Sequence, residues 1–594
     1  MNDIFDCKVV IRFLARKCVR GKQQPQSAAD GTVLSVAQQA LAYMPGSRIR
    51  LRTPRRERRD ESKWKNLFDS IVRLGLGIYW RLERANLLVT ADNGEIHLAQ
   101  DAISEIPSSK LRWFQKVLAF RNSILKMASD DSFSFRSLET IPIRKSNTED
   151  RIIAKFTDLR EAAILACLAK YLTEHFDPYL SGSACAFRSG GKGGFNEAAR
   201  QIRNMRRISN NNQPLYVAEC DLKKFYDTVN HDLLQDAFDV FAECCRKDVS
   251  PLDDRAKLLL AAYLRCYSFK HSVLESKSEK MRRSIDRKRI PWVDESELRN
   301  TYAGMEVPYG KIGIPQGGAI SPLLANIMLH SVDRLVRCEH GRDVCGDDFL
   351  YTRFCDDMII VSADKRMCES AFARYCNEAK RLKLLMHSPK AEIAKYSARW
   401  WQGKTRATYE WSKDAIPWVG FVGYQIRYDG EIRLRKQSLD RVGERLRCEI
   451  GATLKEMCDI SKDTSIDDGV RWKELLDMKM RAIMHITKRL TGKSYLRFRN
   501  GRRVRQYCWA DAFSLLSDSF KESVIARRQI GNIDRLRNDW LNWFNRKVNA
   551  LLPEKLRQPH GFWRRSYSIF DAFEAAHNHL RKANRARGCE LNEY

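Results

Sequence analysis

Two adjacent aspartates, Asp356 and Asp357, are flanked by apolar residues at 349–351 and at 358–361. Short β-rich runs around a polar tip predict two strands joined by a tight turn. Such a turn holds two carboxylates close together, where like charges raise each other's pKa unless a cation lies between them. Mg²⁺ is the usual cation in this situation, because it prefers carboxylate oxygens.

A third aspartate far upstream supports a metal-binding role for this pair. Asp221 directly follows an apolar, strand-like run over residues 215–220. A carboxylate at a strand end, beside a hairpin that carries two more, could complete a site for two metal ions. Other Asp-Asp pairs lie in polar stretches and are expected to be solvated loop charges: Asp253-Asp254, Asp347-Asp348 and Asp467-Asp468.

A segment over residues 313–328 combines backbone features that suit a ligand site. Pro315 bars a helix before it. Gly317 and Gly318 allow the backbone to come close to a ligand. Ser321 and Pro322 stand where the cap and first residue of a helix belong, so a helix is expected from there on.

With these segments in this order, the chain resembles a reverse transcriptase. The resemblance covers roughly residues 130–435 and rests on motifs that follow the order of that family. The matching segments are 221–227 (first palm aspartate), 313–326 (Pro-Gln-Gly…Ser-Pro), 354–357 (the Tyr-x-Asp-Asp box), 385–390 (the lysine segment), 418–424 (the primer grip), and 136–142, 150–152 and 185–188 (the fingers).

The resemblance implies an α+β fold with the right-hand architecture of polymerases: fingers, a palm with an antiparallel sheet, and a helical thumb. The expected domains are a basic, partly helical N-terminal extension (1–130), fingers and palm (131–435), a helical thumb (436–500) and a helical, basic and aromatic C-terminal region (501–594). In the thumb, Ser438 is expected to cap the first helix, and residues 472–490 are expected to form a second amphipathic helix.

The same resemblance implies a two-metal nucleotidyl transfer. Asp221 and Asp356 would bind two Mg²⁺ ions, with Mn²⁺ as an alternative, and the carbonyl of Leu222 would be a further ligand. Asp357 would support the site rather than bridge the metals. Lys390 would be a general acid for the leaving pyrophosphate, although a solvated lysine is an equal reading of that residue.

Further residues are expected to contact the incoming deoxynucleoside triphosphate. Tyr226 stands five residues after Asp221, where the family carries an aromatic ring that excludes a ribose 2′-hydroxyl; ordinary core packing is the alternative reading. The other expected contacts are Gln316 and Gly317 in the nucleotide pocket, and Arg136 and Arg151 on the triphosphate, with Arg144 and Lys145 as substitutes. Phe421, Gly423 and Tyr424 would form the primer grip.

Two residues depart from the family pattern. Phe354 stands in place of the usual tyrosine, and Cys355 in place of a small or aliphatic residue. Neither change removes a metal ligand, so catalytic activity is expected to survive.

The charge of the chain favours a nucleic-acid partner. Its 594 residues carry a formal net charge of +31, which attracts polyanions through phosphate contacts and counterion release. Two basic runs are the expected nucleic-acid contacts, although the first could be only a solvated face: Arg55, Arg56, Arg58 and Arg59, and then Arg497, Arg499, Arg502 and Arg503 among aromatic residues.

The sequence shows no run of about 18 apolar residues, so no membrane span is expected. Its 17 cysteines include no C-x-x-C pair, which favours a reduced, cytoplasmic protein without a zinc site.

Residues 423–435 resemble stand-alone bacterial reverse transcriptases, many of them linked to phage defence. The first hypothesis is therefore RNA-directed DNA synthesis from dNTPs on an RNA template, which could be a dedicated non-coding RNA. The second is a template-independent or protein-primed DNA polymerase on the same palm. The third is a non-catalytic RNA-binding scaffold. A homo-oligomer or a partner protein stays open.

Overall fold

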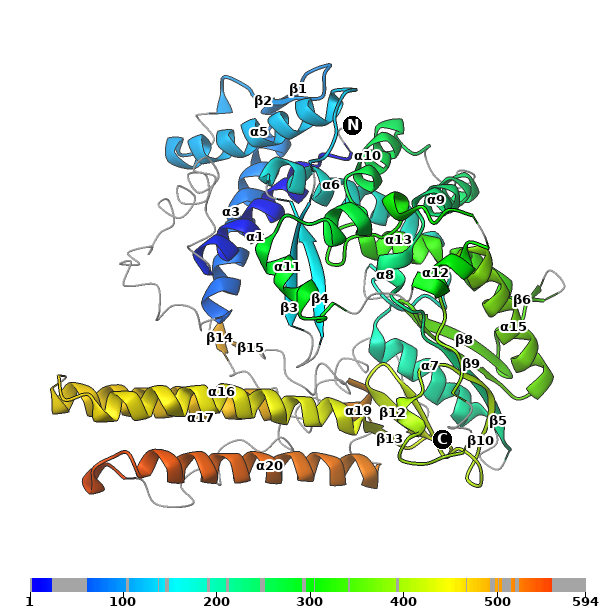
Figure 1. Ribbon diagram of the computed structural model, residues 1–594. Coiled ribbons are helices and arrows are strands. Elements are labelled where there is room, and N and C mark those ends of the chain that lie inside the picture. The colour runs from blue at the N-terminus through cyan, green and yellow to red at the C-terminus, as the bar shows by residue number, and fades with distance from the viewer. Residues whose placement is uncertain are drawn as a thin grey trace. The chain divides into compact units, whose positions relative to one another are not determined.

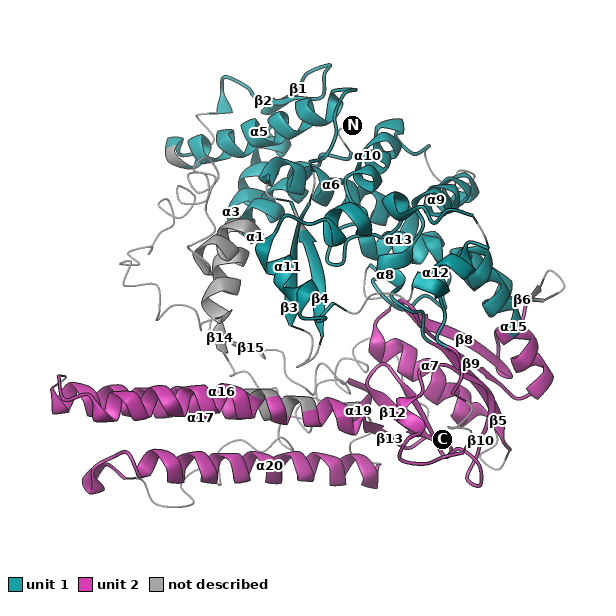
Figure 2. Cartoon of the chain, viewed as in Figure 1, with its two compact units in different colours: residues 1–192, 221–340, 373–387 teal, residues 193–220, 341–372, 388–594 magenta. Residues whose placement is uncertain are grey.

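The computed structural model describes most of the chain, in ranges separated by short gaps. These ranges are 3–23, 61–102, 106–136, 138–144, 149–156, 158–189, 193–209, 213–245, 251–290, 295–303, 305–339, 342–390, 395–465, 467–491, 497–499, 502–504, 514–518 and 523–557. The chain divides into two compact units (Figure 2), and each is described by itself. Unit 1 comprises residues 1–192, 221–340 and 373–387, and unit 2 comprises residues 193–220, 341–372 and 388–594.

The N-terminal part of unit 1 is a group of packed helices with one small hairpin (Figure 1). Its elements are α1 (Cys7–Gln23), α3 (Glu61–Arg84), β1 (Leu88–Thr90), β2 (Ile96–Leu98), α5 (Ser108–Ser129) and α6 (Leu159–Phe176). Helix α3 approaches α1 closely at Gly75, where a β-carbon would lie 2.6 Å from Cγ2 of Ile11. Gly75 is therefore required for this helix contact.

Next in unit 1 is an antiparallel pair, β3 (Glu139–Arg144) and β4 (Asp150–Lys155), in which Ile143 is opposite Arg151. One face of the pair packs on an apolar cluster that includes Ile152, Phe269 and Met281. The remaining helices of unit 1 follow: α8 (Phe225–Thr228), α9 (His231–Cys245), α10 (Asp254–Arg265), η4 (Lys270–Leu274), α11 (Glu279–Asp286), α12 (Glu295–Thr301), η5 (Tyr309–Lys311), α13 (Ser321–Met328) and α14 (His330–Arg337).

The core of unit 2 is a four-stranded antiparallel sheet in the order β10 (Arg406–Trp411), β5 (Leu215–Cys220), β9 (Asp357–Ser362), β8 (Phe349–Phe354). Helix α7 (Phe195–Ile208) packs against β8. All residues of β9 after Asp357 are buried, so both faces of this strand are covered. Helix α15 (Lys365–Arg381) follows β9 in the sequence; its residues up to 372 belong to unit 2 and those from 373 onward belong to unit 1.

A smaller sheet of unit 2 has the order β11 (Trp418–Phe421), β12 (Tyr424–Arg427), β13 (Ile432–Leu434). Three long helices follow, α16 (Lys436–Lys462), α17 (Asp468–Thr491) and α20 (Val524–Asn549), which lie along one another around a shared apolar cluster (Figure 1). The side-chain amide of Gln529 in α20 donates to the carbonyl of Leu434 and accepts from its N–H, both at 2.8 Å. This pair of bonds fastens α20 to the edge strand β13.

Several sequence expectations are confirmed and some are corrected. The strands before Asp221 and around Asp356 are confirmed, as is a helix over residues 472–490 within α17. Ser438 does not cap α16: the helix begins at Lys436, and the Ser438 N–H already donates to the carbonyl of Arg435 at 3.0 Å.

Two of the expected loop charges have a different role. Asp253 caps α10 by accepting the Arg255 N–H at 2.9 Å, and Asp467 accepts the Gly469 N–H at 2.9 Å where α17 begins. A carboxylate at a helix start satisfies backbone donors that would otherwise lack partners. Among the described residues, no helix is both long and apolar enough to cross a lipid bilayer.

Candidate active site

The two adjacent aspartates lie at the tip of a hairpin in unit 2. Phe354 is opposite Asp357, so only Cys355 and Asp356 form the turn between β8 and β9. Cys355 has φ 63°, the left-handed conformation that two-residue hairpins require. The buried guanidinium of Arg353 donates from Nη1 to the Cys355 carbonyl at 3.2 Å. The turn therefore presents Asp356, half-buried, and Asp357, exposed, in a fixed backbone geometry.

Strand β5 leads to the third aspartate. Cys220, its last residue, is opposite Met358 of β9. Asp221 is the next residue, and its α-carbon stays about 3.8 Å from that of Cys220 across a trans peptide bond. The strand pairing of unit 2 thus ends at the two points in the sequence from which the three carboxylates extend.

A buried polar cluster fixes β5 against β10. The carboxylate of Glu219 accepts from the guanidinium of Arg406 and from the hydroxyl of Tyr409. Arg406 also donates from Nη2 to the carbonyls of Trp400 and Gly403, each at 2.8 Å. Burial raises the pKa of Tyr409 well above its ordinary value, so its hydroxyl keeps its proton. This cluster was not predicted from the sequence. The feature that could have indicated it is Glu219, a glutamate inside an apolar run.

In unit 1, the backbone around Asp221 pairs with the lysine segment. The Asp221 carbonyl accepts the His387 N–H at 3.2 Å, Leu222 forms a β-bridge with Met386, and the Lys223 N–H donates to Leu385 at 2.7 Å. Nε2 of His387 lies 3.6 Å from Oδ2 of Asp221. Sequence reasoning missed His387, which stands in the segment that drew attention only for its lysine.

The expected nucleotide contacts Tyr226, Gln316 and Gly317 come together in unit 1. The Tyr226 carbonyl accepts the Ile314 N–H at 2.7 Å, which ties the first aspartate segment to the segment of Gln316. A β-carbon on Gly317, whose φ is 84°, would lie 3.4 Å from Cγ2 of Ile153. The glycine therefore lies against β4.

Arg151 belongs to the same cluster. It is two residues before Ile153 in β4, on the same face of the strand. Its positive charge also favours the ionised form of Asp227, the residue after Tyr226. These contacts bring Arg151, Tyr226, Gln316 and Gly317 into one part of unit 1, and their role in nucleotide binding stays a prediction.

Asp227 is the buried acid of this cluster, with 6% of its surface exposed. Nε2 of Gln316 donates to its Oδ1 at 3.3 Å. Burial raises the pKa of Asp227 to about 6, against the lowering effect of Lys224, the Gln316 bond and Arg151. Sequence reasoning gave this residue no role.

One part of the chain matches a known protein family. Residues 266–422 match the family model described as "Reverse transcriptase (RNA-dependent DNA polymerase)". The chain contains a reverse transcriptase domain. It is therefore an enzyme of the nucleotidyltransferase class. The matched residues include Gln316 and the Asp356 turn, whereas Asp221 and Tyr226 precede them.

Among solved structures, the chain is similar at low levels to telomerases. Apo telomerase from Candida tropicalis, truncated from its C-terminal domain, shares 13% identity over 72% of this chain and 95% of that chain, with a TM-score of 0.31. Telomerase from Candida albicans in complex with a TWJ fragment of telomeric RNA shares 11% identity over 89% and 76%, also at 0.31. TM-scores of this size carry no argument. A search of curated proteins found no match.

Two further residues that were expected to contact the nucleotide lie outside this cluster or in the other unit. Arg136 is exposed and forms ion pairs with Asp158, at 3.7 Å, and Glu161, at 3.4 Å, near the start of α6. Its ion-pair partners are thus outside the nucleotide cluster. Lys390 is exposed and belongs to unit 2.

The expected primer grip is the β11–β12 hairpin. Phe421 and Tyr424 are the buried residues that close it, and the Tyr424 hydroxyl donates to Oδ1 of Asn196 at 2.6 Å. Val422 and Gly423 form the turn, with φ 41° and 92°. Both aromatic rings are buried by packing. The turn is therefore the part of this hairpin that a ligand could contact.

The expected basic contacts are only partly within the described residues. Arg497, Arg499, Arg502 and Arg503 belong to the hairpin of β14 (Arg497–Arg499) and β15 (Arg502–Val504), in which Arg499 is opposite Arg502. Arg55, Arg56, Arg58 and Arg59 lie outside the described residues.

The three aspartates are the residues that would hold the metal ions implied by the resemblance. Within the ranges that the structure describes, no three His, Cys, Asp or Glu side chains are grouped closely enough to hold a metal ion. Asp221 belongs to unit 1, and Asp356 and Asp357 belong to unit 2, so their grouping depends on the two units together. The donors fit in kind, because carboxylate and carbonyl oxygens are the ligands that Mg²⁺ prefers.

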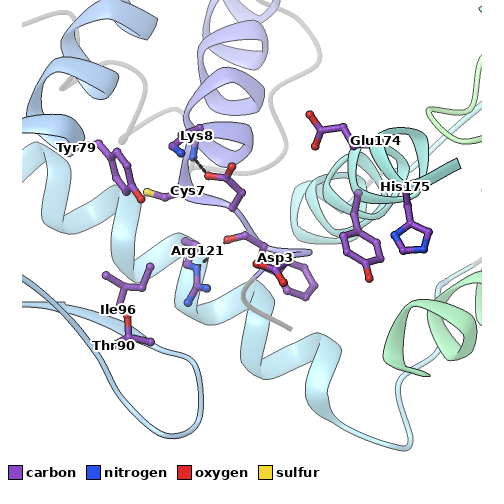
Figure 3. Close-up of a pocket in the computed structure, with 12 residues that line it drawn as sticks. Asp3, Cys7, Lys8, Tyr79, Thr90, Ile96, Arg121, Glu174 and His175 are labelled. Carbon is purple, nitrogen blue, oxygen red and sulfur yellow. Dashed lines mark hydrogen bonds between the residues drawn. The ribbon is translucent and has the colours of Figure 1, made fainter. Parts of the chain in front are cut away.

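A cavity of about 550 Å³ lies among the N-terminal helices of unit 1 (Figure 3). The three carboxylates of Asp3, Asp6 and Glu174 line it together with Arg121, whose Nε donates to the Phe5 carbonyl at 3.0 Å. No residue expected from the sequence to bind nucleotide, metal or primer lines this cavity.

Proposed function

We propose that this protein is an RNA-directed DNA polymerase, which extends a 3′-hydroxyl with deoxynucleoside triphosphates. The observation that carries the proposal is the tip of the β8–β9 hairpin, which presents Asp356 and Asp357. It lies inside the reverse transcriptase domain, and the strand beside it leads directly to Asp221. In this proposal the sheet β10–β5–β9–β8 is the palm of a right-hand polymerase.

The proposed metal ligands are Asp221, Asp356 and the carbonyl of Leu222, with Asp357 in support. Two bound Mg²⁺ ions, or Mn²⁺ ions, would activate the attacking hydroxyl and stabilise the leaving pyrophosphate. The hairpin contributes rigidity, since Arg353 fixes the Cys355 carbonyl from within the core. Rigid carboxylates need little rearrangement during the reaction, which is the main source of catalysis in phosphoryl transfer.

The cluster in unit 1 is the proposed nucleotide pocket. Arg151 would bind the triphosphate, because a guanidinium grips phosphate oxygens in a fixed geometry. Gly317, without a side chain, would let the backbone approach the nucleotide. The ring of Tyr226 would exclude a ribose 2′-hydroxyl and so select deoxynucleotides.

The remaining elements complete the proposed layout. Strands β3 and β4 would belong to the fingers, the turn of Val422 and Gly423 would contact the primer, and helices α16, α17 and α20 would form the thumb. The RNA template would be held by the basic surface of a chain with net charge +31. Arg136 and Lys390 stay as proposed contacts of the triphosphate and the pyrophosphate.

The direct test is synthesis by the purified protein. We expect DNA to be made from the four dNTPs and Mg²⁺ on an RNA template annealed to a DNA primer, and synthesis to stop after RNase treatment. Product made from a single dNTP without any RNA would instead establish the template-independent alternative. Absence of synthesis on every primer and template, with RNA binding retained, would leave the scaffold alternative.

We also propose a role in antiphage defence, because residues 423–435 resemble stand-alone bacterial reverse transcriptases of that kind. This segment is the β12–β13 hairpin and its flanks. The test is phage plating on cells that carry the gene, compared with cells that carry Asp356→Ala. Equal plaque numbers on both would contradict the role.

A further inference from the structure

Asp227 lies in the nucleotide pocket just described and is not one of the residues expected there. It is the third residue of the short helix α8, and its N–H donates to the Lys224 carbonyl at 2.8 Å. Lys224 has φ 49°, a conformation that turns the chain sharply before α8. The helix thus aims the Asp227 side chain into the protein, directly beside the proposed sugar gate Tyr226.

The backbone on both sides of the Asp227–Gln316 contact is fixed. The Gly313 N–H donates to the Val229 carbonyl at 2.8 Å, and the Ile314 N–H donates to Tyr226 at 2.7 Å. Nε2 of His231 donates to the Gly313 carbonyl at 2.6 Å, because a carbonyl oxygen can only accept a hydrogen bond. The two segments therefore meet in one register, and the side chains of Asp227 and Gln316 face each other as a consequence.

An ionised carboxylate can only accept hydrogen bonds, so it decides which way the facing amide points. Gln316 must turn its NH₂ toward Asp227, and its carbonyl oxygen then points the other way. Without that partner, the two ends of the amide would be nearly equivalent in size and free to exchange. Burial raises the pKa of Asp227 to about 6, against the lowering effect of Lys224 and Arg151, so the side chain is ionised above that pH.

We propose that Asp227 is a positioning residue for the incoming deoxynucleotide. Its carboxylate holds the Gln316 amide in one orientation, so that the amide oxygen accepts a hydrogen bond from the nucleotide. This inference rests on the proposed function, because it assigns a further residue to the same pocket. Asp227 acts through Gln316 and does not itself contact the substrate.

The test is a double-mutant cycle of Asp227→Asn and Gln316→Ala, read as KM for dNTP and kcat separately. Loss of one oriented hydrogen bond is expected to raise KM about tenfold in each single variant, with a smaller change in kcat. In the Gln316→Ala background, Asp227→Asn should have no further effect on KM. Independent, additive effects would overturn the proposal. Asp232→Asn, at an exposed carboxylate five residues further on, is the matched control.

A second cycle keeps the proposal testable if Asp227→Asn is poorly folded. Gln316→Glu places two carboxylates face to face, so it should lower the unfolding temperature and raise KM. Adding Asp227→Asn restores a hydrogen bond, in which residue 227 is now the donor and residue 316 the acceptor. Stability should recover, whereas dNTP affinity should not, because the introduced carboxylate presents a charged group to the nucleotide. Recovery of both would show a purely structural contact and overturn the proposal.

Failure of the proposed function is distinguished by the wild-type protein. Equilibrium binding of dATP and primer extension are measured on it first. Wild-type protein without either activity contradicts the polymerase itself. Wild-type protein with both activities, together with an Asp227→Asn variant of unchanged KM, contradicts only the positioning role.

Discussion

Cys220 is opposite Met358 in the antiparallel pair of β5 and β9. Each of these residues is a direct neighbour in the sequence of an aspartate, Asp221 and Asp357 respectively. A strand register inside one unit thus links two segments of the chain that are far apart in sequence. The proposed metal site depends on that register more than on any single side-chain contact.

Asp221→Ala should reduce DNA synthesis to the level of a control without protein, because a proposed metal ligand is lost. RNA binding should be retained. Primer extension and RNA binding are measured side by side, with Asp347→Ala at an exposed aspartate as the control. Normal incorporation by Asp221→Ala would show that Asp221 is not a metal ligand.

Tyr226→Ala should relax the discrimination against ribonucleotides by about tenfold to a hundredfold, as expected when a pocket wall is removed. The measurement is the ratio of kcat/KM for dATP and ATP on one primer and template. Tyr226→Phe keeps the ring and should keep the ratio. If Tyr226→Ala leaves the ratio unchanged, the ring packs in the core and has no role as a gate.

Cys355→Val should destabilise the protein by about 1–2 kcal/mol, because a β-branched side chain is strained at a φ of 63°. Cys355→Gly should relieve this strain. Denaturant unfolding gives the difference, with Cys220→Val in the regular strand β5 as the control. A Cys355→Val variant as stable as the control would show that the turn adapts to the new residue.

Arg406→Met should cost about 3–5 kcal/mol, because it leaves the buried Glu219 carboxylate without its cation. The partly exposed pair of Arg427 and Asp429 provides the comparison, since Arg427→Met should cost only about 0–1 kcal/mol. Both variants are compared by chemical denaturation. Equal effects would indicate that water reaches the Glu219 site.

The pKa of Asp227 predicts a pH dependence of stability. Its folded value of about 6 is above the ordinary 3.8, so the folded protein binds this proton more tightly than the unfolded chain does. The stabilisation from this group is complete below about pH 4 and is lost as the pH rises through about 6, a change of about 3 kcal/mol.

The measurement for that prediction is the unfolding free energy of the wild type minus that of Asp227→Asn, between pH 4 and pH 7. This difference should fall as the pH rises, because asparagine does not titrate. A flat difference would mean that Asp227 keeps an ordinary pKa in the folded protein. The exposed variant Asp232→Asn shows the background dependence.

The sequence was informative where a local pattern determines local structure. The apolar runs around Asp356 predicted the hairpin, and the run before Asp221 predicted β5, because strand formation and tight turns depend on neighbouring residues. The reverse transcriptase motifs then led to Arg151, Tyr226, Gln316 and Gly317, which meet in one cluster.

What the sequence could not show are contacts between distant segments. Nothing near Glu219 indicates that Arg406 and Tyr409 will surround it, nor does Gln316 indicate its bond with Asp227. His387 escaped notice because only the backbone pairing with Asp221 brings it close. Ser438 failed as a helix cap because start signals are ambiguous by a few residues.

The turn of Cys355 and Asp356 has a consequence for how this chain can vary. Because β9 is buried on both faces, its apolar residues do not distinguish one register from the next, and the length of the turn must do so. A single inserted or deleted codon there would shift the carboxylates along the sheet while leaving an intact core. Homologous chains are therefore expected to keep Asp356, to exchange only the residue at position 355 of this turn, and never to change its length.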